Sequence, residues 1–406
     1  MSVLEIQNPL WKMCMFISLM RRRMTVYKHE CFKIFSKPSI YLVFALITGL
    51  LLWGEQSIPP EPVFDESHEE LIERWGGPVT EEMNEIVREE MVMQDGGESP
   101  DNLHPIEGNV HFSIASAWGN KEAMKERKAD LQMKKEELTP SSYAWRVASK
   151  EQEMYEKVGE AHGFFIVEGW RGMFDFLEPF FSVILLAVLI LVGLSPVFAD
   201  EHGKRMAGLL LATKHGRKKL VTAKLLAGIT YIAAIFVSLH VVNTVIHVVK
   251  FGGLGGWDAP IQSLWSSMFA WWSPYGQSPF AWNVLEFWGA TLTVQFFGSL
   301  VFGVLVLVCS QLTRNAMVAF FISGCVLAAP YVIRQLGLEH GMMEYVTAFS
   351  YMELIRTERL FQTFEAYNVF GIPVLYHTVL ICLFALITVG VTVLLYWSHK
   401  HEQVAG

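Results

Sequence analysis

Residues 220–249 have the sequence LVTAKLLAGITYIAAIFVSLHVVNTVIHVV, an apolar run of 30 residues in which Lys224 is the only Lys, Arg, Asp or Glu. About 20 apolar residues are enough for a helix to cross the hydrocarbon core of a bilayer. The run is continuous rather than alternating, which favours a helix over a barrel strand. Five further runs share this character, at about 38–53, 174–198, 287–312, 317–336 and 370–397. The sequence therefore predicts an all-α polytopic membrane protein with six transmembrane helices.

The charged residues are concentrated in residues 54–172, which hold 26 acidic and 12 basic residues. The rest of the chain holds 14 acidic and 20 basic residues, so an acidic, polar insert interrupts a basic, apolar frame. This distribution excludes an ordinary soluble enzyme, a nucleic-acid-binding protein and a disordered chain. None of the five cysteines lies in the insert, which excludes an exported domain held together by disulfides.

Basic residues in the short connecting segments predict the orientation, because cytosolic loops are enriched in Lys and Arg. They cluster in residues 12–37, in residues 204–224, at Arg314 and at Lys400. With six spans, all of these segments fall on one side. We therefore expect a plasma-membrane protein with cytosolic N- and C-termini and an extracellular insert at 54–172.

Residues 1–37 alternate aromatic and basic side chains, which predicts an amphipathic helix lying at the inner membrane surface. For Arg21, Arg22 and Arg23, an equally good explanation is a plain cluster of basic residues on the cytosolic side of the first span. The apolar residues 13–20 precede these arginines. That order is the reverse of a signal peptide, so no cleaved signal is expected.

The insert is rich in Glu, Lys, Met and Ala, which favours helices. Helix starts are predicted at Thr80 and at Ser141-Ser142, and Gly96-Gly97 divides the block near its middle. Its apolar residues are sparse. We therefore expect a small helical hairpin or bundle, and we assign its acidic side chains no ligand.

Three polar residues, His240, Asn243 and His247, follow i, i+3, i+7 spacing on one face of the third run. One interpretation is a polar path or a metal site. The other is hydrogen bonding between helices, which we favour because two residues one heptad apart lie ~10.5 Å apart along a helix and cannot share an ion unaided. Glu178 and Glu286 lie near the outer ends of their spans, and neither is assigned to a substrate.

The segment between the second and third runs, FADEHGKRMAGLLLATKHGRKKLVTAK at 198–224, is the richest in chemistry. We predict a short cytosolic helix with Asp200 and Glu201 at its N-terminal side, where the helix dipole favours acids. Basic residues then mark the membrane surface, and Lys224 is expected to extend back toward it. Such a helix suits docking to a partner, although a plain positive loop has the same charge pattern.

This segment resembles the intracellular loop of ABC-2 type transporter permeases, in which an F-x-x-E, a Gly, a Leu pair, a Gly-Arg and a later Lys link the second and third helices. The matching residues are Phe198, Glu201, Gly203, Leu209, Leu210, Gly216, Arg217 and Lys224. The residues before the first span, and the order of the parts along the whole chain, are also similar to this family.

The resemblance implies the permease subunit of a bacterial ATP-binding cassette exporter, with residues 199–219 as the loop that couples it to an ATPase. It implies two partners, an ATP-binding subunit and a second permease chain, in a lipid membrane and without nucleic acid. ATP and magnesium would be bound by the partner ATPase, and this chain would carry no cofactor or metal. It also implies half-inserted helices in residues 341–370.

The chain has no G-x-x-x-x-G-K-[ST], H-E-x-x-H or G-x-S-x-G motif, so the sequence shows no enzyme site. Two rival functions stay open. One is an intramembrane metalloenzyme such as a protease, which would use His240 or His247. The other is a membrane sensor or assembly protein whose acidic insert binds an outside ligand.

Overall fold

The computed structural model describes residues 26–57, 66–95, 105–175, 184–203, 206, 218–264 and 274–401. Within these residues, five helices are long and apolar enough to cross a membrane, judged by length and composition. They cover Ile184–Gly203, Lys218–Phe251, Val284–Thr313, Ala316–Gln335 and Tyr376–Lys400. A sixth is obtained if Val26–Phe35 and Pro38–Gly54 are counted as one span bent by 52°. The protein is thus predominantly helical and compatible with a membrane protein.

The bend separates the helix Val26–Phe35 from α2 (Pro38–Ser57). It falls at Lys37, the residue before a proline, where steric conflict with the proline ring disfavours helical backbone. Pro38 then occupies the first position of α2, where its missing N–H costs nothing. Residues 1–25, which hold most of the predicted amphipathic helix, lie outside the described residues.

In the second predicted span, at 174–198, the structure describes the end of α7 (Glu168–Asp175), then α8 (Ile184–Leu194) and the start of α9 (Pro196–Gly203). Residues 176–183, which include Glu178, lie outside the described residues. The break between α8 and α9 at Ser195 is not visible in the hydropathy of the run. The break occurs there because Pro196 has no backbone N–H to donate a hydrogen bond to α8, and it starts α9 instead.

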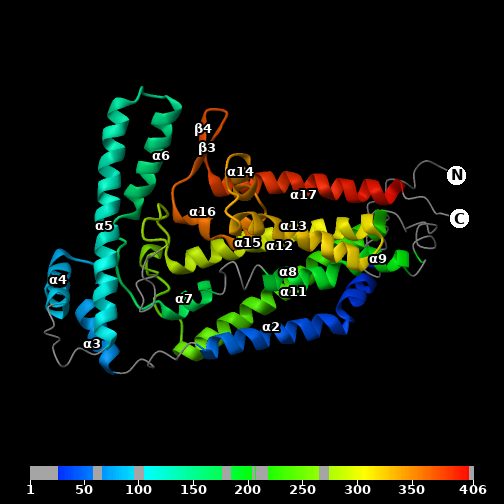
Figure 1. Ribbon diagram of the computed structural model, residues 1–406, viewed down its shortest axis with the longest axis horizontal. Coiled ribbons are helices and arrows are strands. Elements are labelled where there is room, and N and C mark those ends of the chain that lie inside the picture. Colours follow the sequence, from blue (N-terminus) through cyan, green and yellow to red (C-terminus); the bar gives the residue numbers. More distant parts are fainter. Residues whose placement is uncertain are drawn as a thin grey trace, which may run out of the picture.

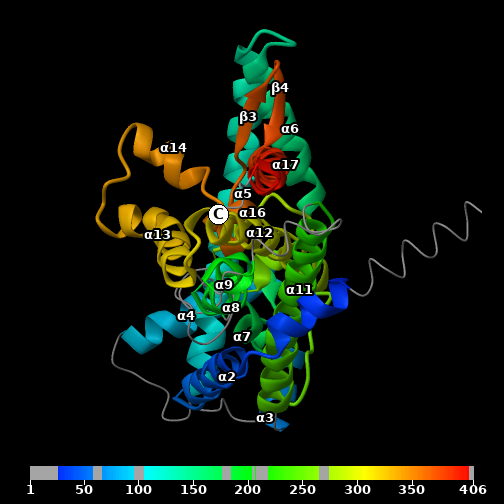
Figure 2. The same cartoon turned by 90° about the vertical axis from the view of Figure 1, so that its right-hand side faces the viewer.

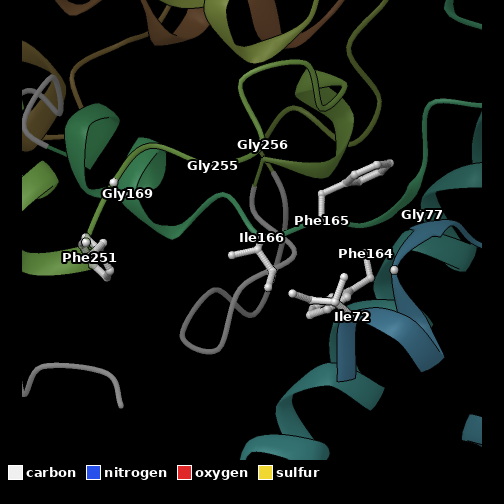
Figure 3. A pocket seen from close by; sticks show the side chains of 12 residues that line it. Ile72, Gly77, Phe164, Phe165, Ile166, Gly169, Phe251, Gly255 and Gly256 are labelled. Carbon is white, nitrogen blue, oxygen red and sulfur yellow. The ribbon is translucent and has the colours of Figure 1, made fainter. Parts of the chain in front are cut away.

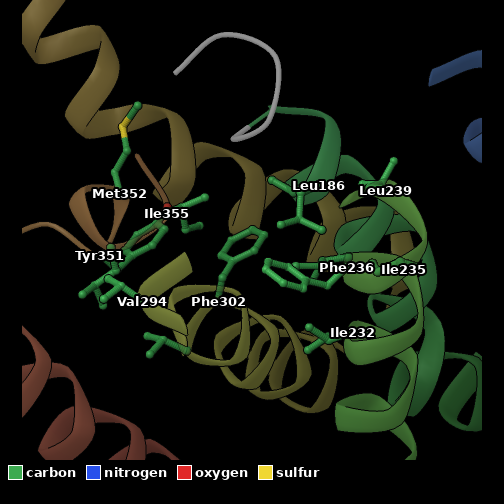
Figure 4. Packing of buried hydrophobic residues seen from close by; sticks show 14 of the residues in the cluster. Leu186, Ile232, Ile235, Phe236, Leu239, Val294, Phe302, Tyr351, Met352 and Ile355 are labelled. Carbon is green, nitrogen blue, oxygen red and sulfur yellow. The ribbon is translucent and has the colours of Figure 1, made fainter. Parts of the chain in front are cut away.

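The central helix of the bundle is α12 (Val284–Thr313). It packs against α8, α9, α11 (Lys218–Phe251), α13 (Ala316–Gln335), α15 (Met352–Arg356) and α17 (Tyr376–His401). Asn283 starts it with a capping box that includes Glu286, so Glu286 serves the helix terminus. Figure 4 shows side chains of different elements meeting around Phe302 of α12, among them Ile232 of α11 and Tyr351. Next along the chain is α13 (Ala316–Gln335), capped by Asn315.

The sixth span was predicted from residue 370, and this start is wrong. Residues Ala366–Val369 and Ile372–Leu375 form a hairpin, β3 and β4, and α17 (Tyr376–His401) follows it. Phe370 and Gly371 both have positive φ, 51° and 84°, as the tightest hairpin turns require. The apolar run continues through the turn, so hydropathy alone cannot place the helix start.

Three short helices lie before the hairpin, α14 (Met342–Ala348), α15 (Met352–Arg356) and α16 (Glu358–Gln362). They fall in the segment predicted to hold half-inserted helices. α15 lies directly against α12, because a Cβ at Gly298 would come within 2.9 Å of the Leu354 Cβ. Small residues permit such close approach between helices in membrane proteins.

The insert contains α3 (Glu66–Trp75), α4 (Glu81–Asp95), α5 (Pro105–Glu137), α6 (Tyr143–Val158) and a two-residue pairing of β1 (Gly77–Pro78) with β2 (Gly163–Phe164). Two of its helices, α4 and α6, start where predicted: the Thr80 hydroxyl accepts from the Met83 N–H, and Ser142 caps α6. The expected break at Gly96-Gly97 lies outside the described residues. Figures 1 and 2 show α5 and α6 running across the direction of the spanning helices.

Candidate functional site

Lys224 is fully buried on α11, where its ammonium group has three acceptors. Its Nζ donates to Glu201 Oε1 at 2.7 Å, to the Val197 carbonyl at 2.8 Å and to Glu30 Oε2 at 2.9 Å. An ammonium has three N–H donors, so the whole hydrogen-bonding capacity of this buried cation is used. The expectation that Lys224 extends to the membrane surface is therefore wrong.

Lys33 connects the same two carboxylates from the other side. Its Nζ donates to Glu30 Oε1 and to Glu201 Oε1, each at 2.9 Å. Two cations and two anions thus form one neutral group, which we call the Lys224 network (Glu30, Lys33, Glu201 and Lys224). Neutrality and complete hydrogen bonding are the conditions under which buried charges are tolerated.

The network joins three segments that are distant in sequence. Glu30 and Lys33 belong to the helix Val26–Phe35, Glu201 to α9, and Lys224 to α11. At the edge of the network, the more exposed Asp200 lies 3.6 Å from Lys37. The predicted docking segment is therefore linked by ion pairs to the helix before the first span.

Phe198 supports the network from α9. The Lys224 Nζ lies 5.1 Å from the centre of its ring, and His399 of α17 contacts the ring edge-on. The backbone N–H groups of Phe198 and Ala199 both donate to Ser310 Oγ of α12 at 3.1 Å, and that hydroxyl donates to the Ser195 carbonyl. Ser310 thus satisfies backbone groups at the α8–α9 break and fixes the start of α9.

The structure brings together three of the residues selected from the sequence, Phe198, Glu201 and Lys224. Gly203 ends α9. The remaining four, Leu209, Leu210, Gly216 and Arg217, lie outside the described residues. Asp200 and Glu201 lie toward the C-terminal end of α9, which starts at Pro196. The short helix predicted to follow them falls on residues that, apart from Met206, lie outside the described part of the chain.

Glu30 and Lys33 were not predicted from the sequence as site residues. The available signal was an acid–base pair at i, i+3 spacing within a strongly basic segment. That spacing is common on solvated helix faces, so the sequence alone does not distinguish a buried pair from an exposed one.

A cavity of about 720 Å³ lies beside the network, between the helix Val26–Phe35 and α9. Its lining includes three charged residues of the network, Glu30, Lys33 and Glu201, and it combines further polar side chains with apolar ones such as Phe32 and Met206. Its lining residues are Val26, His29, Glu30, Phe32, Lys33, Ile34, Ser36, Lys37, Pro196, Val197, Asp200, Glu201, Met206 and Leu220.

A second pocket, of about 540 Å³, lies between the insert and the end of α11 (Figure 3). Seven of its twelve lining residues are glycines, and the others are Ile72, Phe164, Phe165, Ile166 and Phe251. None of these side chains ionises or acts as a nucleophile. We therefore assign this pocket no chemistry.

The polar face of α11 is occupied by hydrogen bonds to other segments. His240 Nε2 donates to Gln295 Oε1 of α12 at 2.8 Å, and the Asn243 amide donates to the Met173 carbonyl at 3.2 Å. His247 Nδ1 donates to the Asn243 carbonyl within α11. The contacts of His240 and Asn243 match the interhelical hydrogen bonding that the sequence favoured, whereas the His247 contact stays within α11. In the described part of the chain, no group of three His, Cys, Asp or Glu side chains is placed to hold a metal ion.

Comparison of the chain with protein-family models, curated proteins and solved structures gave no match. Its function is therefore inferred from its own residues and their geometry.

Proposed function

We propose that this chain is the membrane-spanning subunit of an ABC-2 type ATP-binding cassette exporter in a plasma membrane. In this proposal it has six spans, with the bent pair of helices as the first. Both termini and the loop at 199–219 face the cytosol, and the acidic insert at 54–172 is outside. The apolar helices, the charge distribution and the residues of the 198–224 segment support this assignment.

The observation that carries the proposal is the Lys224 network. The loop expected to meet an ATPase is joined through Glu201 to α11 and to the helix before the first span. Removing one partner from a buried ion pair costs about 3–5 kcal/mol, so these segments should move together. A force applied to the loop would therefore reach two spans at once.

ATP hydrolysis belongs to the partner in this proposal, because the sequence has no P-loop. Closure of two ATP-binding subunits would displace the loops of two paired permease chains. The cavity beside the network provides the room in which α9 and the helix Val26–Phe35 can shift. The cargo enters at the interface between the two permease chains.

The test is purification of the tagged full-length chain from its native membrane, followed by identification of co-purifying proteins. We expect an ATP-binding subunit with a P-loop, and ATP hydrolysis in the purified complex. Absence of any such subunit under conditions that retain other membrane complexes would contradict the proposal.

Met206 offers a sharper version of this test. It is 48% exposed, and its N–H donates to the Glu201 carbonyl, so it marks the surface next to the network. Met206→Arg should release the ATPase, while Met343→Arg, at a residue of α14 that is 46% exposed, should not. Glu201→Arg is a poorer probe, because it would break the network from within.

A membrane sensor is the second candidate, and one observation favours it. The insert contacts the hairpin before α17: Arg146 donates to the Gly371 carbonyl at 3.1 Å and Lys150 to the Pro373 carbonyl at 2.9 Å. A conformational change on ligand binding to the insert would thus be transmitted through these two hydrogen bonds to the hairpin and to α17. ATP-driven transport by a chain with these two contacts removed would favour the exporter.

A further inference from the structure

A buried carboxylate lies where α13, α15 and α12 meet, far from the Lys224 network in sequence. Glu353 is 2% exposed. Its Oε1 accepts one hydrogen bond, from Arg334 Nη2 at 2.9 Å. Its Oε2 is buried and has no hydrogen-bond partner among the described residues. A buried ionised carboxylate normally has both oxygens satisfied, so the environment of Glu353 is incomplete for the charged form.

Arg334 is not dedicated to Glu353. Its Nε donates to Glu339 Oε1 at 2.9 Å, and Glu339 is partly exposed. The guanidinium is therefore divided between two acids instead of forming the two parallel bonds of a bidentate pair. If Glu353 became neutral, Arg334 would keep Glu339 as its partner and would not be left as an unpaired charge.

Two buried hydroxyl groups belong to residues shortly before Glu353 in the chain. Ser350 Oγ and Tyr351 Oη are both buried and have no hydrogen-bond partner among the described residues. Ser350 lies three residues before Glu353, and its carbonyl accepts the Glu353 N–H at 3.2 Å. The Tyr351 ring stacks on Phe302 of α12, with 5.7 Å between ring centres. Buried polar atoms without a hydrogen-bond partner among the described residues thus gather in the residues 350–353.

The charged and titratable groups that face Glu353 are Arg334 of α13, Arg356 of its own helix, Arg359 of α16 and Tyr376 of α17. Burial raises the pKa of Glu353, and this effect exceeds the opposing influence of the three arginines. From α12, the residue that contacts the α15 backbone is Gln295, which does not titrate and donates to the Ile355 carbonyl.

We propose that Glu353 is a proton-binding site whose protonation loosens the link between α13 and α15. A proton from solvent adds to Oε2 and converts the carboxylate to a neutral carboxylic acid, and no covalent bond breaks. Oε2 accepts no hydrogen bond from the described residues that the added proton would displace. The hydrogen bond from Arg334 then joins a charged donor to a neutral acceptor and loses the attraction between opposite charges, so α15 is held less firmly.

The test is infrared spectroscopy of the full-length chain, titrated from about pH 8 to about pH 5, the range that includes known buried carboxyl groups. We expect a band of a protonated, buried carboxylic acid that grows as the pH falls. Glu353→Gln should abolish this band. Glu344→Gln, at an exposed acid of α14, should leave it intact. A titration that is the same in the wild type and Glu353→Gln would overturn the proposal.

Two further measurements keep the proposal testable if Glu353→Gln does not fold. Glu353→Asp retains a carboxyl group and should shift the band without removing it, and an unshifted band would place the proton elsewhere. In the wild type, hydrogen exchange in residues 352–356, corrected for its intrinsic pH dependence, should become faster as the band grows. Unchanged exchange would show that protonation does not loosen α15.

Discussion

Glu201 and Lys224 are 23 positions apart in the chain, and their charged groups meet at 2.7 Å with the lysine fully buried. The sequence places Glu201 in the predicted cytosolic loop at 199–219 and Lys224 at the start of the third apolar run. Their contact shows instead that α9 is tied inward to α11. Any partner that binds the 199–219 loop would therefore act on a segment already connected to the helix bundle.

Lys224→Met should destabilise the protein strongly, because it leaves Glu30 and Glu201 with less than their full charge compensation. We expect a loss of about 3–5 kcal/mol in the free energy of unfolding, measured by denaturant unfolding in detergent. Lys37→Met is the control, because Lys37 and Asp200 form a longer and more exposed pair worth about 0–1 kcal/mol. Equal losses in the two variants would contradict the assigned burial.

The Lys224 network should also make the effects of its mutations on the free energy of unfolding non-additive. Glu201→Gln and Lys224→Met remove opposite ends of one contact, so their combined effect should be smaller than the sum of the single effects. The expected coupling energy is about 0.5–3 kcal/mol, measured by a double-mutant cycle on unfolding. Strict additivity would show that the two charges do not interact.

Gly298→Ala should weaken the packing of α15 on α12, because the added Cβ would lie 2.9 Å from the Leu354 Cβ and 3.0 Å from the Ile355 side chain. Such overpacking typically costs about 1–3 kcal/mol. Gly289→Ala lies on the same helix with no atom within 4 Å of the new Cβ. It should be neutral or stabilising by up to about 1 kcal/mol. Thermal unfolding of both variants distinguishes the two sites.

Removing the contacts between the insert and the hairpin should free β3 and β4 without unfolding α6. In the double variant Arg146→Ala, Lys150→Ala, we expect faster hydrogen exchange in residues 366–375, because their carbonyls lose two donors from α6. Lys157→Ala, in an exposed ion pair on the same helix, should leave this exchange unchanged. Slow exchange in the double variant would mean that the hairpin is held by other contacts.

The protein should become less stable at acid pH through His162, which is buried in the insert. Burial lowers the pKa of His162 below its ordinary value of 6.5, with partial opposition from its hydrogen bond to the Gly276 carbonyl. The unfolded chain therefore binds a proton at a pH where the folded chain does not. By linkage, stability falls as the pH drops below about 6.5 and levels off below the folded pKa.

His162→Gln should reduce this dependence, and His340→Gln, at an exposed histidine, should not. Unfolding curves at several pH values check both. An unchanged pH dependence in His162→Gln would show that His162 is already protonated in the folded protein or remains accessible to solvent.

The sequence alone determined the helical class, most of the spanning segments and the helix starts at Thr80 and Ser142. These properties depend on hydropathy over about 20 residues and on side chains that bond within one turn. It also identified Phe198, Glu201 and Lys224 as residues of interest, from the order of residue types within one segment.

Only the tertiary structure decided which charges meet. Lys224 and Glu30 are 194 positions apart, and their contact depends on how three helices are rotated and docked, which no local pattern encodes. The same holds for Arg334 and Glu353. The break at Ser195 and the hairpin before α17 escaped detection for a related reason: hydropathy records how apolar a segment is, whereas a proline or two positive φ angles decide whether its backbone continues as a helix.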